Sequence, residues 1–500
     1  MKESTDFIYK EQKELSVIGG IGALLGWDQL TYMPSDGAND RSEQTAFISR
    51  LSHEKTVSDT FWKHIEFLSK NIDDLSEKDK LVVSRLRKDV EKARKIPSNF
   101  VERMAKTTTI AYQSWEKALA KNDFKIFQPH LKKIVELEKE YTGFINLPGP
   151  RYNSLLDDYE EGMTVDILKK EFEHLKKDIA KILDKIKDGS IFEKQQEIKI
   201  KLDKEKQRKL CNLVIEKMGL PSEKSRLDVS THPFTTSMGY DDVRITTSYN
   251  RPSPLFSFFS TIHEGGHALY ELGMPKGDFK NTAISDSPSL GLHESQSRFW
   301  ENMIARRKEF WKYFYPVFQK TAPEQFKNID FEKWYQTVNQ VRPSLIRVEA
   351  DELTYCLHVI LRFEIETGLI EDKINVSELP QIWNQKMDEL LGIKPSNDVE
   401  GVLQDMHWSG GSFGYFPTYA IGSMYSAQIF NKLVEEKPET VNEIERADFK
   451  NIVSWLNEKI HQHGRKMMAD EIIKNCCGEG LNSKVYVEYL KNKYLDLYQI

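Results

Sequence analysis

Apolar residues recur at steps of three and four along most of this 500-residue chain. The stretches 81–96 and 165–189 show the pattern most clearly, and the second ends at a glycine after lysines in its last turn. This spacing puts apolar side chains on one face of a helix, and glycine commonly ends one. The pattern therefore predicts a mainly α-helical fold built from amphipathic helices.

One stretch departs from the helical pattern. Residues 232–254 are rich in threonine, tyrosine and β-branched residues, and a Gly-Tyr-Asp-Asp sequence lies at 239–242. Runs of this kind divided by turn residues are typical of a β-hairpin. We therefore expect a small hairpin or sheet here, directly before the next helix.

No segment has the composition of a linker, and the chain contains no internal repeat. We therefore predict one α-rich domain over residues 1–500. Within it, an N-terminal helical lobe is expected over about 1–225. The region 226–500 carries the motifs described below.

Charge and cysteine content exclude several classes of protein. The chain has 71 Lys and Arg against 77 Asp and Glu, a net charge of −6, so we expect no nucleic-acid or anionic-lipid partner. Four cysteines without CxxC spacing are typical of free thiols in a reducing compartment. With no apolar signal segment and no run of about 18 apolar residues, a cytoplasmic protein without a membrane span is expected.

The stretch 254–275 has the pattern of one apolar helix with His263, Glu264 and His267 in its middle. Pro254 suits the first turn of such a helix. Histidines four residues apart share a helix face and can bind one metal ion, and the glutamate can act as general base on a water there. Two core histidines with a carboxylate partner are the alternative interpretation.

A catalytic metal site needs a third protein ligand and an open position. Glu271 would lie about 12 Å along the helix axis from His263, too far to share one ion. The extended form HExxHxxGxxH is excluded, because this chain has Tyr270 and Gly273 where that form requires glycine and histidine. The third ligand must therefore come from another element.

A second helix can supply that ligand. Residues 287–311 begin in a Pro/Ser/Gly loop and continue with a strongly amphipathic pattern. Its first turn would carry His293 and Glu294, and a carboxylate there would complete a His-His-Glu set. The spacing alone leaves both residues as candidates.

The chain resembles the carboxypeptidase Taq family of HExxH metallocarboxypeptidases over nearly its whole length. The resemblance rests on motifs that follow one another in order. These are GWDQLTYMPSDGANDRSEQ near the N-terminus, HPF at 232–234, DVRIT at 242–246, HEGGH at 263–267, HESQ at 293–296, IRVEAD at 346–351 and GVLQDMHW at 401–408. The defining positions of these motifs show no departure.

The resemblance implies a mostly helical fold with a deep groove between lobes and a small sheet beside the metal helix. It implies one divalent metal ion per chain, zinc first and cobalt as the alternative, bound by His263, His267 and Glu294. A homodimer and a peptide substrate are also implied. The expected activity is release of single C-terminal amino acids with broad specificity and poor cleavage of proline.

Further candidates lie in the glycine- and aromatic-rich stretch 404–422. Tyr415 and His407 are eight residues apart, a spacing similar to that of a histidine–tyrosine pair in related helical HExxH peptidases. We assign Tyr415 to the oxyanion and His407 to the substrate backbone, with Tyr419 as a further substrate-binding candidate. Ordinary aromatic packing is the alternative for both tyrosines.

An exopeptidase must also recognise the free C-terminal carboxylate. Arginine suits this task because its planar guanidinium can pair with a carboxylate through two hydrogen bonds. Arg347 is the first candidate and Arg244 the second, although either could instead be structural, Arg347 by bracing a helix through Asp351. His232 is expected to contact substrate, the alternative being a buried histidine that fixes the hairpin.

Two other functions compete with a metallocarboxypeptidase. A metallo-oligoendopeptidase acting on short peptides would also suit a helical groove. A helical binding protein with a structural metal is a third possibility, but such a site has no use for the general base Glu264. The adjacent Gly265 and Gly266 suggest that the hairpin and the Glu294 helix approach the metal helix closely.

Overall fold

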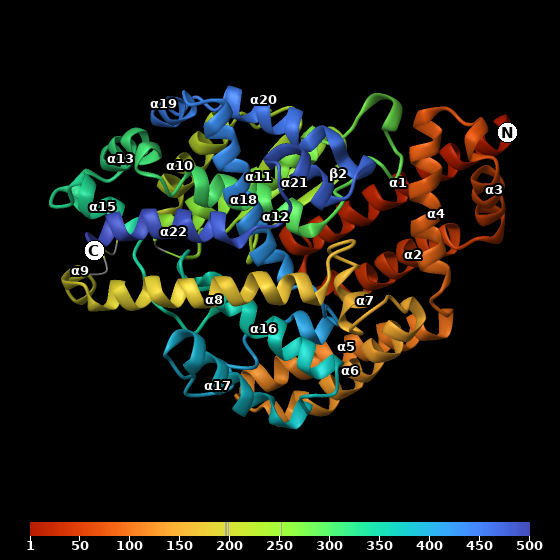
Figure 1. The fold of residues 1–500 in the computed structure, drawn as a ribbon, viewed down its shortest axis with the longest axis horizontal. Coiled ribbons are helices and arrows are strands. Elements are labelled where there is room, and N and C mark those ends of the chain that lie inside the picture. Colours follow the sequence, from red (N-terminus) through yellow and green to blue (C-terminus); the bar gives the residue numbers. More distant parts are fainter. Residues whose placement is uncertain (196–197, 199, 252) are drawn as a thin grey trace.

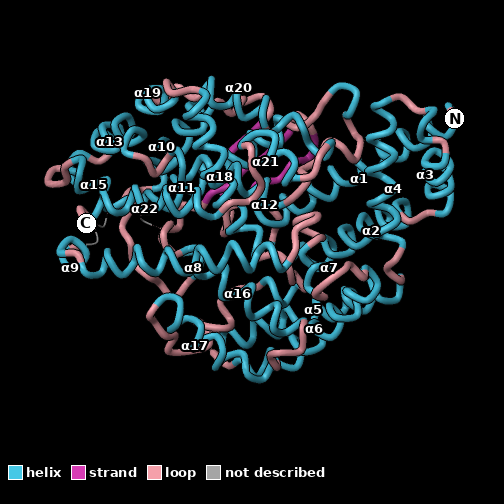
Figure 2. Tube along the Cα trace, viewed as in Figure 1, coloured by secondary structure: helices cyan, strands magenta, loops and turns pink. Residues whose placement is uncertain are grey.

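The computed structural model describes residues 1–195, 198, 200–251 and 253–500, and it is mainly helical (Figures 1 and 2). The helices before the strands are α1 (Lys2–Thr31), α2 (Ala38–Thr56), α3 (Asp59–Lys70), α4 (Glu77–Arg94), α5 (Ser98–Lys121), α6 (Phe124–Ile145), α7 (Tyr152–Leu156), α8 (Val165–Asp188), α9 (Ser190–Lys194) and α10 (Lys204–Met218). The two helices predicted from periodicity are therefore present as α4 and α8.

Helices also dominate after the strands. They are α11 (Pro254–Gly273), α12 (Leu290–Arg298), α13 (Lys308–Thr321), α14 (Pro323–Phe326), α15 (Phe331–Val338), α16 (Tyr355–Ile370), α17 (Leu379–Leu391), α18 (Pro417–Glu436), α19 (Thr440–Glu445), α20 (Lys450–Lys459), α21 (Ala469–Cys477) and α22 (Ser483–Tyr498). Helix α12 continues into a π-helical segment, η4 (Phe299–Ile304). Short 3₁₀ segments include η5 (Arg347–Glu349) and η7 (His407–Gly410).

The described residues form three strands, which are β1 (Ser225–Val229), β2 (Thr235–Gly239) and β3 (Asp242–Thr247). They form one sheet in the order β1-β3-β2. Strands β2 and β3 are antiparallel and joined at the predicted turn, so the hairpin prediction is confirmed. Strand β1, which the sequence pattern did not indicate, pairs with β3 in parallel.

In the part of the chain that the structure describes, two hydrophobic cores hold the helices together. The larger contains residues from 111 to 498, including Leu131 of α6, Phe258 of α11 and Leu361 of α16. The smaller contains residues of α1, α3 and α4 together with Ile284. The larger core takes residues from both sides of position 225, and the division of one domain into lobes there remains a prediction.

Helix α11 packs beside the hairpin, as expected. The Thr247 hydroxyl donates to the Ser257 carbonyl oxygen (3.1 Å), so β3 and the first turns of α11 are joined directly. Pro254 occupies the first turn, whereas Ser253 lies at the N-cap position without a capping side-chain hydrogen bond. The sheet thus fixes the helix that carries the HEGGH sequence.

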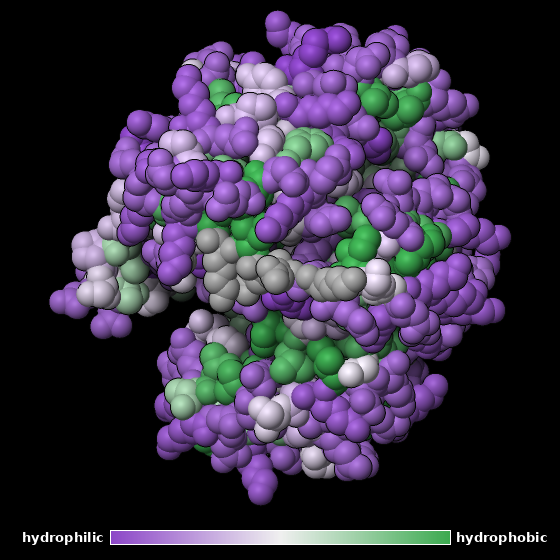
Figure 3. Space-filling view, turned by 90° about the vertical axis from the view of Figure 1, so that its left-hand side faces the viewer, coloured by the Kyte–Doolittle hydropathy of each residue, from purple (hydrophilic) through white to green (hydrophobic). Residues whose placement is uncertain are grey.

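The face of the molecule drawn in Figure 3 is mainly hydrophilic. Seen from the left-hand side of Figure 1, polar side chains cover most of the molecule and apolar ones reach the surface in separate groups (Figure 3). Within the described part of the chain, no helix combines the length and apolarity that crossing a membrane would need. All four cysteines are free, as their spacing predicts.

Candidate metal centre

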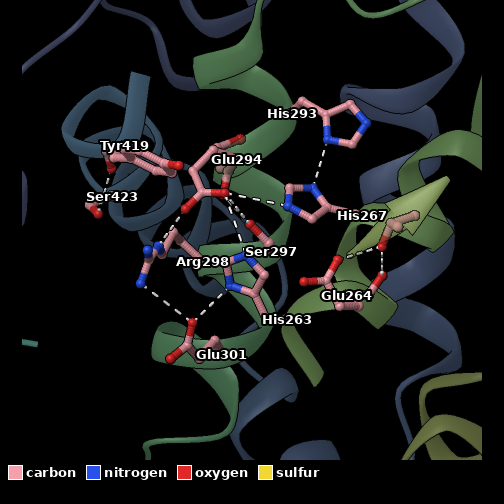
Figure 4. A network of polar contacts seen from close by, with 12 residues as sticks. His263, Glu264, His267, His293, Glu294, Ser297, Arg298, Glu301, Tyr419 and Ser423 are labelled. Carbon is pink, nitrogen blue, oxygen red and sulfur yellow. Dashed lines mark hydrogen bonds and ion pairs between the residues drawn. The ribbon is translucent and has the colours of Figure 1, made fainter. Parts of the chain in front are cut away.

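His263, His267 and Glu294 converge at the contact between α11 and α12 (Figure 4). Their candidate ligand atoms all lie within 4.8 Å of one another. The Glu294 Oε2 atom is 3.6 Å from His263 Nε2 and 3.4 Å from His267 Nε2. Two imidazoles and one carboxylate match the donor set of a catalytic divalent metal, and three protein ligands leave a position for water or substrate.

The position of His263 is fixed by a carboxylate behind it. Glu301 accepts from His263 Nδ1 at 2.9 Å and is itself paired with Arg298 (3.4 Å) and Arg306 (3.3 Å). Burial alone would lower the pKa of His263, but Glu294 and Glu301 raise it to about 9. The Nδ1 bond leaves Nε2 directed at the site, the usual arrangement behind a metal-binding histidine.

His267 is held differently, by a second histidine. Its Nδ1 lies 2.6 Å from His293 Nδ1, and His293 Nε2 lies 2.7 Å from Glu271 Oε1. His293, the other candidate third ligand, therefore supports a ligand from behind. Burial and the neighbouring His293 lower the pKa of His267 to about 4, which favours the neutral form that binds metal.

Glu294 offers one oxygen to the site. Its Oε1 accepts from Arg298 Nε at 2.7 Å, and its Oε2 accepts from the Ser297 hydroxyl at 3.0 Å while facing both histidines. Burial would raise the pKa of Glu294, but Arg298 and His263 hold it well below its usual value. The side chain is therefore ionised and can serve as the third ligand of a divalent metal ion.

Glu264 lies beside the ligands and is anchored by the hairpin. The Thr235 hydroxyl of β2 is 2.6 Å from Glu264 Oε2 and 3.1 Å from the Glu264 carbonyl oxygen. Burial raises the pKa of Glu264, whereas His263 and the bond from Thr235 act to lower it. A buried carboxylate with a raised pKa suits a group that accepts and returns a proton.

A cavity of about 330 Å³ opens beside these residues. Its walls come from the segment before and into β2, from α11 and α12, and from the region around the start of α18. They are Pro233, Phe234, Thr235, His263, Glu264, His267, Leu290, His293, Glu294, Tyr415, Thr418 and Tyr419. Both predicted tyrosines therefore face the metal centre, whereas His407 is not among the lining residues.

His407 nevertheless lies close to these tyrosines. Its ring centroid is 5.4 Å from that of Tyr415, and its Nε2 is 3.4 Å from the Tyr419 hydroxyl. Burial lowers the pKa of His407 to about 4, so its imidazole is neutral near pH 7. A neutral imidazole beside a substrate cavity can donate or accept a hydrogen bond.

Arg347 belongs to a buried charged cluster next to His407. Asp405 Oδ1 accepts from Arg347 Nε (3.1 Å) and Nη2 (2.9 Å), and Asp405 Oδ2 accepts from Arg362 Nε (2.6 Å). Arg347 Nη1 donates to the Tyr355 hydroxyl, and the Arg347 guanidinium lies 4.9 Å from the Tyr419 ring centroid. The alternative pairing of Arg347 with Asp351 is wrong, because η5 ends before Asp351 and Arg347 turns toward Asp405.

Arg244 and His232 lie outside the cavity wall. Arg244 forms two bonds of 2.8 Å to Asp242 and covers the Trp27 ring at 4.4 Å, so it joins the sheet to α1. The His232 side chain is exposed, which rules out a buried histidine that fixes the hairpin. Contact of either residue with substrate stays a prediction.

Sequence reasoning missed the residues behind the ligands. Glu301, Arg298 and Thr235 are ordinary by composition, and only their place in the fold gives them a role. Glu271 was set aside as a ligand, yet its bond to His293 makes it part of the support for His267. The sequence contains one signal for Glu301: it follows Arg298 by three residues on the predicted helix, a spacing at which the two side chains can pair.

A helical fold with a His-His-Glu donor set and an adjacent buried glutamate defines the class of HExxH metallopeptidases. Within that class the family is clear: the model of the carboxypeptidase Taq (M32) metallopeptidases matches residues 7–494, and the chain belongs to this family. It is therefore an M32 metallocarboxypeptidase.

Relatives match along the full length. Carboxypeptidase 1 of Bacillus subtilis is 39% identical over 97% of each chain, and thermostable carboxypeptidase 1 of Pyrococcus furiosus is 39% identical over 99% of each. Among solved structures, the M32 carboxypeptidase of Deinococcus radiodurans aligns with a TM-score of 0.95 at 34% identity over 100% of both chains. Metallocarboxypeptidase 1 of Trypanosoma cruzi aligns with a TM-score of 0.94 at 33% identity, covering 99% of this chain and 100% of that one.

Proposed function

We propose that this enzyme removes single amino acids from the C-terminus of peptides, with broad specificity and poor activity on proline. The observation that carries the proposal is the buried cluster of Arg347, Arg362 and Asp405. Arg347 is 6% exposed and Arg362 is 0% exposed. Among the described residues, Asp405 is the sole carboxylate that pairs with either guanidinium, so two positive charges share one negative charge.

Such an imbalance is costly in a buried cluster unless an anion from outside joins it. A peptide with its last residue in the cavity would bring its terminal carboxylate to this side of the site. Arg347 is the better partner for that carboxylate, because its guanidinium lies over Tyr419, which lines the cavity. Within the described part of the chain, three of its five N–H groups have partners, which leaves two for substrate.

We propose one divalent ion per chain, zinc first and cobalt as the alternative, bound by His263, His267 and Glu294. When bound, such an ion lowers the pKa of a water ligand and polarises a carbonyl group. Glu264 takes the proton of the attacking water and later passes it to the leaving amine. Its Oε1 serves this exchange, because Oε2 is held by Thr235.

Tyr415 donates to the oxyanion that develops on the scissile carbonyl. Burial raises the pKa of Tyr415, which keeps its hydroxyl protonated and able to donate. His407 binds the substrate backbone, and Tyr419 contributes to substrate binding beside it. The resemblance to the family also supports a homodimer.

The test compares one peptide with a free C-terminus and the same peptide with an amidated C-terminus. Products are identified by mass spectrometry. The proposal expects release of single residues from the free peptide and at least about a tenfold lower rate on the amidated one, since a charge-assisted bond contributes roughly 1.5–3 kcal/mol. Equal rates with cleavage at internal bonds would favour the oligoendopeptidase. Removal of metal with a chelator should abolish both activities.

A further inference from the structure

Glu366 of α16 is a fully buried carboxylate that collects three hydrogen bonds. Its Oε1 accepts from Trp408 Nε1 at 2.7 Å. Its Oε2 accepts from the Gly414 backbone N–H at 3.0 Å and from the Tyr152 hydroxyl at 2.6 Å. Trp408 and Gly414 are six residues apart and lie on the segment 407–416, which consists of η7 and the loop that leads into α18.

Both proposed catalytic side chains of this segment adjoin a residue that Glu366 holds. His407 directly precedes Trp408, and Tyr415 directly follows Gly414. The two rings are tilted by 45° to each other, with their centroids 5.4 Å apart. One carboxylate therefore joins the two points of the chain from which the His407 and Tyr415 side chains extend.

The backbone at Gly414 is confined on its other side. Its φ is +90°, and a Cβ atom there would lie 2.6 Å from the Leu155 carbonyl oxygen. Only glycine fits both conditions without strain. The Gly414 backbone is therefore held between Glu366 on one side and Leu155 on the other. This restricts the backbone position of the next residue, Tyr415.

Trp408 is equally confined. Its ring stacks on Phe413 at 6.1 Å with an interplanar angle of 17° and meets Trp383 edge-on at 5.9 Å. Among the described residues the Trp383 indole nitrogen has no hydrogen-bond partner, whereas that of Trp408 donates to Glu366. Both tryptophans are buried, and the Trp383 ring also lies 4.6 Å from the Arg362 guanidinium.

Burying a carboxylate costs free energy, and an apolar side chain could pack against the loop without that cost. Burial raises the pKa of Glu366 to about 7, and the bonds from Tyr152, Gly414 and Trp408 act against that rise. Among the described residues, no lysine or arginine forms an ion pair with Glu366. Glu366 instead accepts hydrogen bonds from three donors at defined points of the chain. These bonds fix direction as well as distance, which an apolar side chain could not do.

We propose that Glu366 is a positioning residue that sets the spacing and orientation of Tyr415 and His407 toward the substrate. The inference rests on the roles proposed above for those two residues. It acts through the bonds to Trp408 Nε1 and Gly414 N. Because small displacements of a catalytic group cost up to about a hundredfold in rate, loss of either bond should lower kcat more than it raises KM.

The test is a matched pair of tryptophan variants. Trp408→Phe removes the bond to Glu366. Trp383→Phe makes the same change in ring size at a neighbouring buried tryptophan, removes no hydrogen bond among the described residues and keeps an aromatic face for Arg362. We expect kcat for a free peptide to fall at least about tenfold in Trp408→Phe and less than about threefold in Trp383→Phe, at equal metal content. Equal losses in the two variants would overturn the proposal, because packing alone would then explain them.

Glu366→Gln provides the second measurement and should lower kcat as Trp408→Phe does. A double-mutant cycle with Tyr415→Phe tests the route of action: adding Glu366→Gln to Tyr415→Phe should cost less than it costs alone. Fully multiplicative losses would contradict positioning through Tyr415. A native kcat in Tyr415→Phe alone would instead count against the proposed oxyanion role, and the tryptophan pair would still test Glu366.

Discussion

A Cβ atom at Gly266 would lie 2.6 Å from the backbone carbonyl oxygen of Gln296. The backbones of α11 and α12 are therefore in direct contact at this point. The contact lies next to His267 on α11 and close to Glu294 on α12. Gly265 differs, since a Cβ there would meet the end of the Met218 side chain at 2.8 Å. The expected approach of the Glu294 helix is confirmed at Gly266, but the neighbour of Gly265 is α10 and not the hairpin.

Gly266→Ala should separate the two helices and weaken metal binding. Overpacking of this kind costs about 1–3 kcal/mol, and the helix separation moves Glu294 from both histidines. We expect metal affinity, measured by chelator competition, to fall at least about tenfold while helix content by circular dichroism changes little. Gly265→Ala is the control, because the flexible Met218 side chain can move aside. A metal-replete, fully active Gly266→Ala variant would contradict this account.

Glu264→Gln should retain the metal and lose hydrolysis. The amide keeps the size of the side chain and removes its capacity to accept a proton. We expect kcat to fall by about 10²–10⁴-fold, with metal content by elemental analysis unchanged, because Glu264 is not a ligand. Normal turnover in this variant would contradict the proposed role of Glu264 as general base.

Thr235→Val should impair catalysis through Glu264. Valine keeps the shape of threonine and removes the hydroxyl that bonds to Glu264 Oε2 at 2.6 Å. A hydrogen bond to a charged group contributes about 1.5–3 kcal/mol, so kcat should fall roughly 10- to 100-fold. Thr235→Ser should restore most of the rate, and Thr236→Val, on the next residue of β2, should have little effect. If serine and valine are equally poor, the hydroxyl is not what orients Glu264.

Local patterns were enough to predict the elements that carry the site. Helix α11 follows from Pro254 and the HEGGH sequence, and the β2–β3 hairpin follows from its Gly-Tyr-Asp-Asp turn. Strand β1 escaped prediction because it pairs in parallel with β3, which requires a connection that no local pattern reveals. Alternation on one short strand is also weak evidence by itself.

The supporting contacts of the site could not be predicted for a related reason. Glu301 is 38 residues from His263, and Asp405 is 58 residues from Arg347. Such pairs are set by how helices pack, and propensity or periodicity says nothing about them. Glu301 lies outside the quoted motifs, and Asp405, although part of GVLQDMHW, has no local feature that pairs it with Arg347.

Glu160→Gln should change how stability depends on pH. Glu160 is buried, forms no ion pair with any described residue and accepts from the Gly291 amide in the first turn of α12. Burial raises the pKa of Glu160 from 4.5 to about 8, so the folded protein binds more protons than the unfolded chain between these values. The contribution of Glu160 to stability is therefore full below about pH 4.5 and lost as the pH rises through about 8.

Relative to the native protein, the Glu160→Gln variant should gain roughly 1 kcal/mol or more between about pH 5 and pH 9, measured by denaturant unfolding. Glu161→Gln is the control, and its effect on stability should have the opposite sign. Burial would raise the pKa of Glu161, but Lys88 and Arg85 lower it below its usual value. Loss of this carboxylate should therefore destabilise the protein above about pH 4.5. Parallel pH curves for native and Glu160→Gln proteins would show that Glu160 stays ionised in the fold.

Arg347→Gln should remove the distinction between free and amidated peptides. The glutamine cannot pair with a terminal carboxylate, so kcat/KM on the free peptide should fall about 10- to 100-fold while the slow rate on the amidated peptide stays near its native value. Asp405 keeps Arg362 as a partner in this variant, which limits the effect on folding. Arg244→Gln, which loses the contact with Trp27, should lower thermal stability and leave the ratio of the two rates intact. If Arg244→Gln abolishes the ratio and Arg347→Gln preserves it, the carboxylate is bound at the sheet and not beside Tyr419.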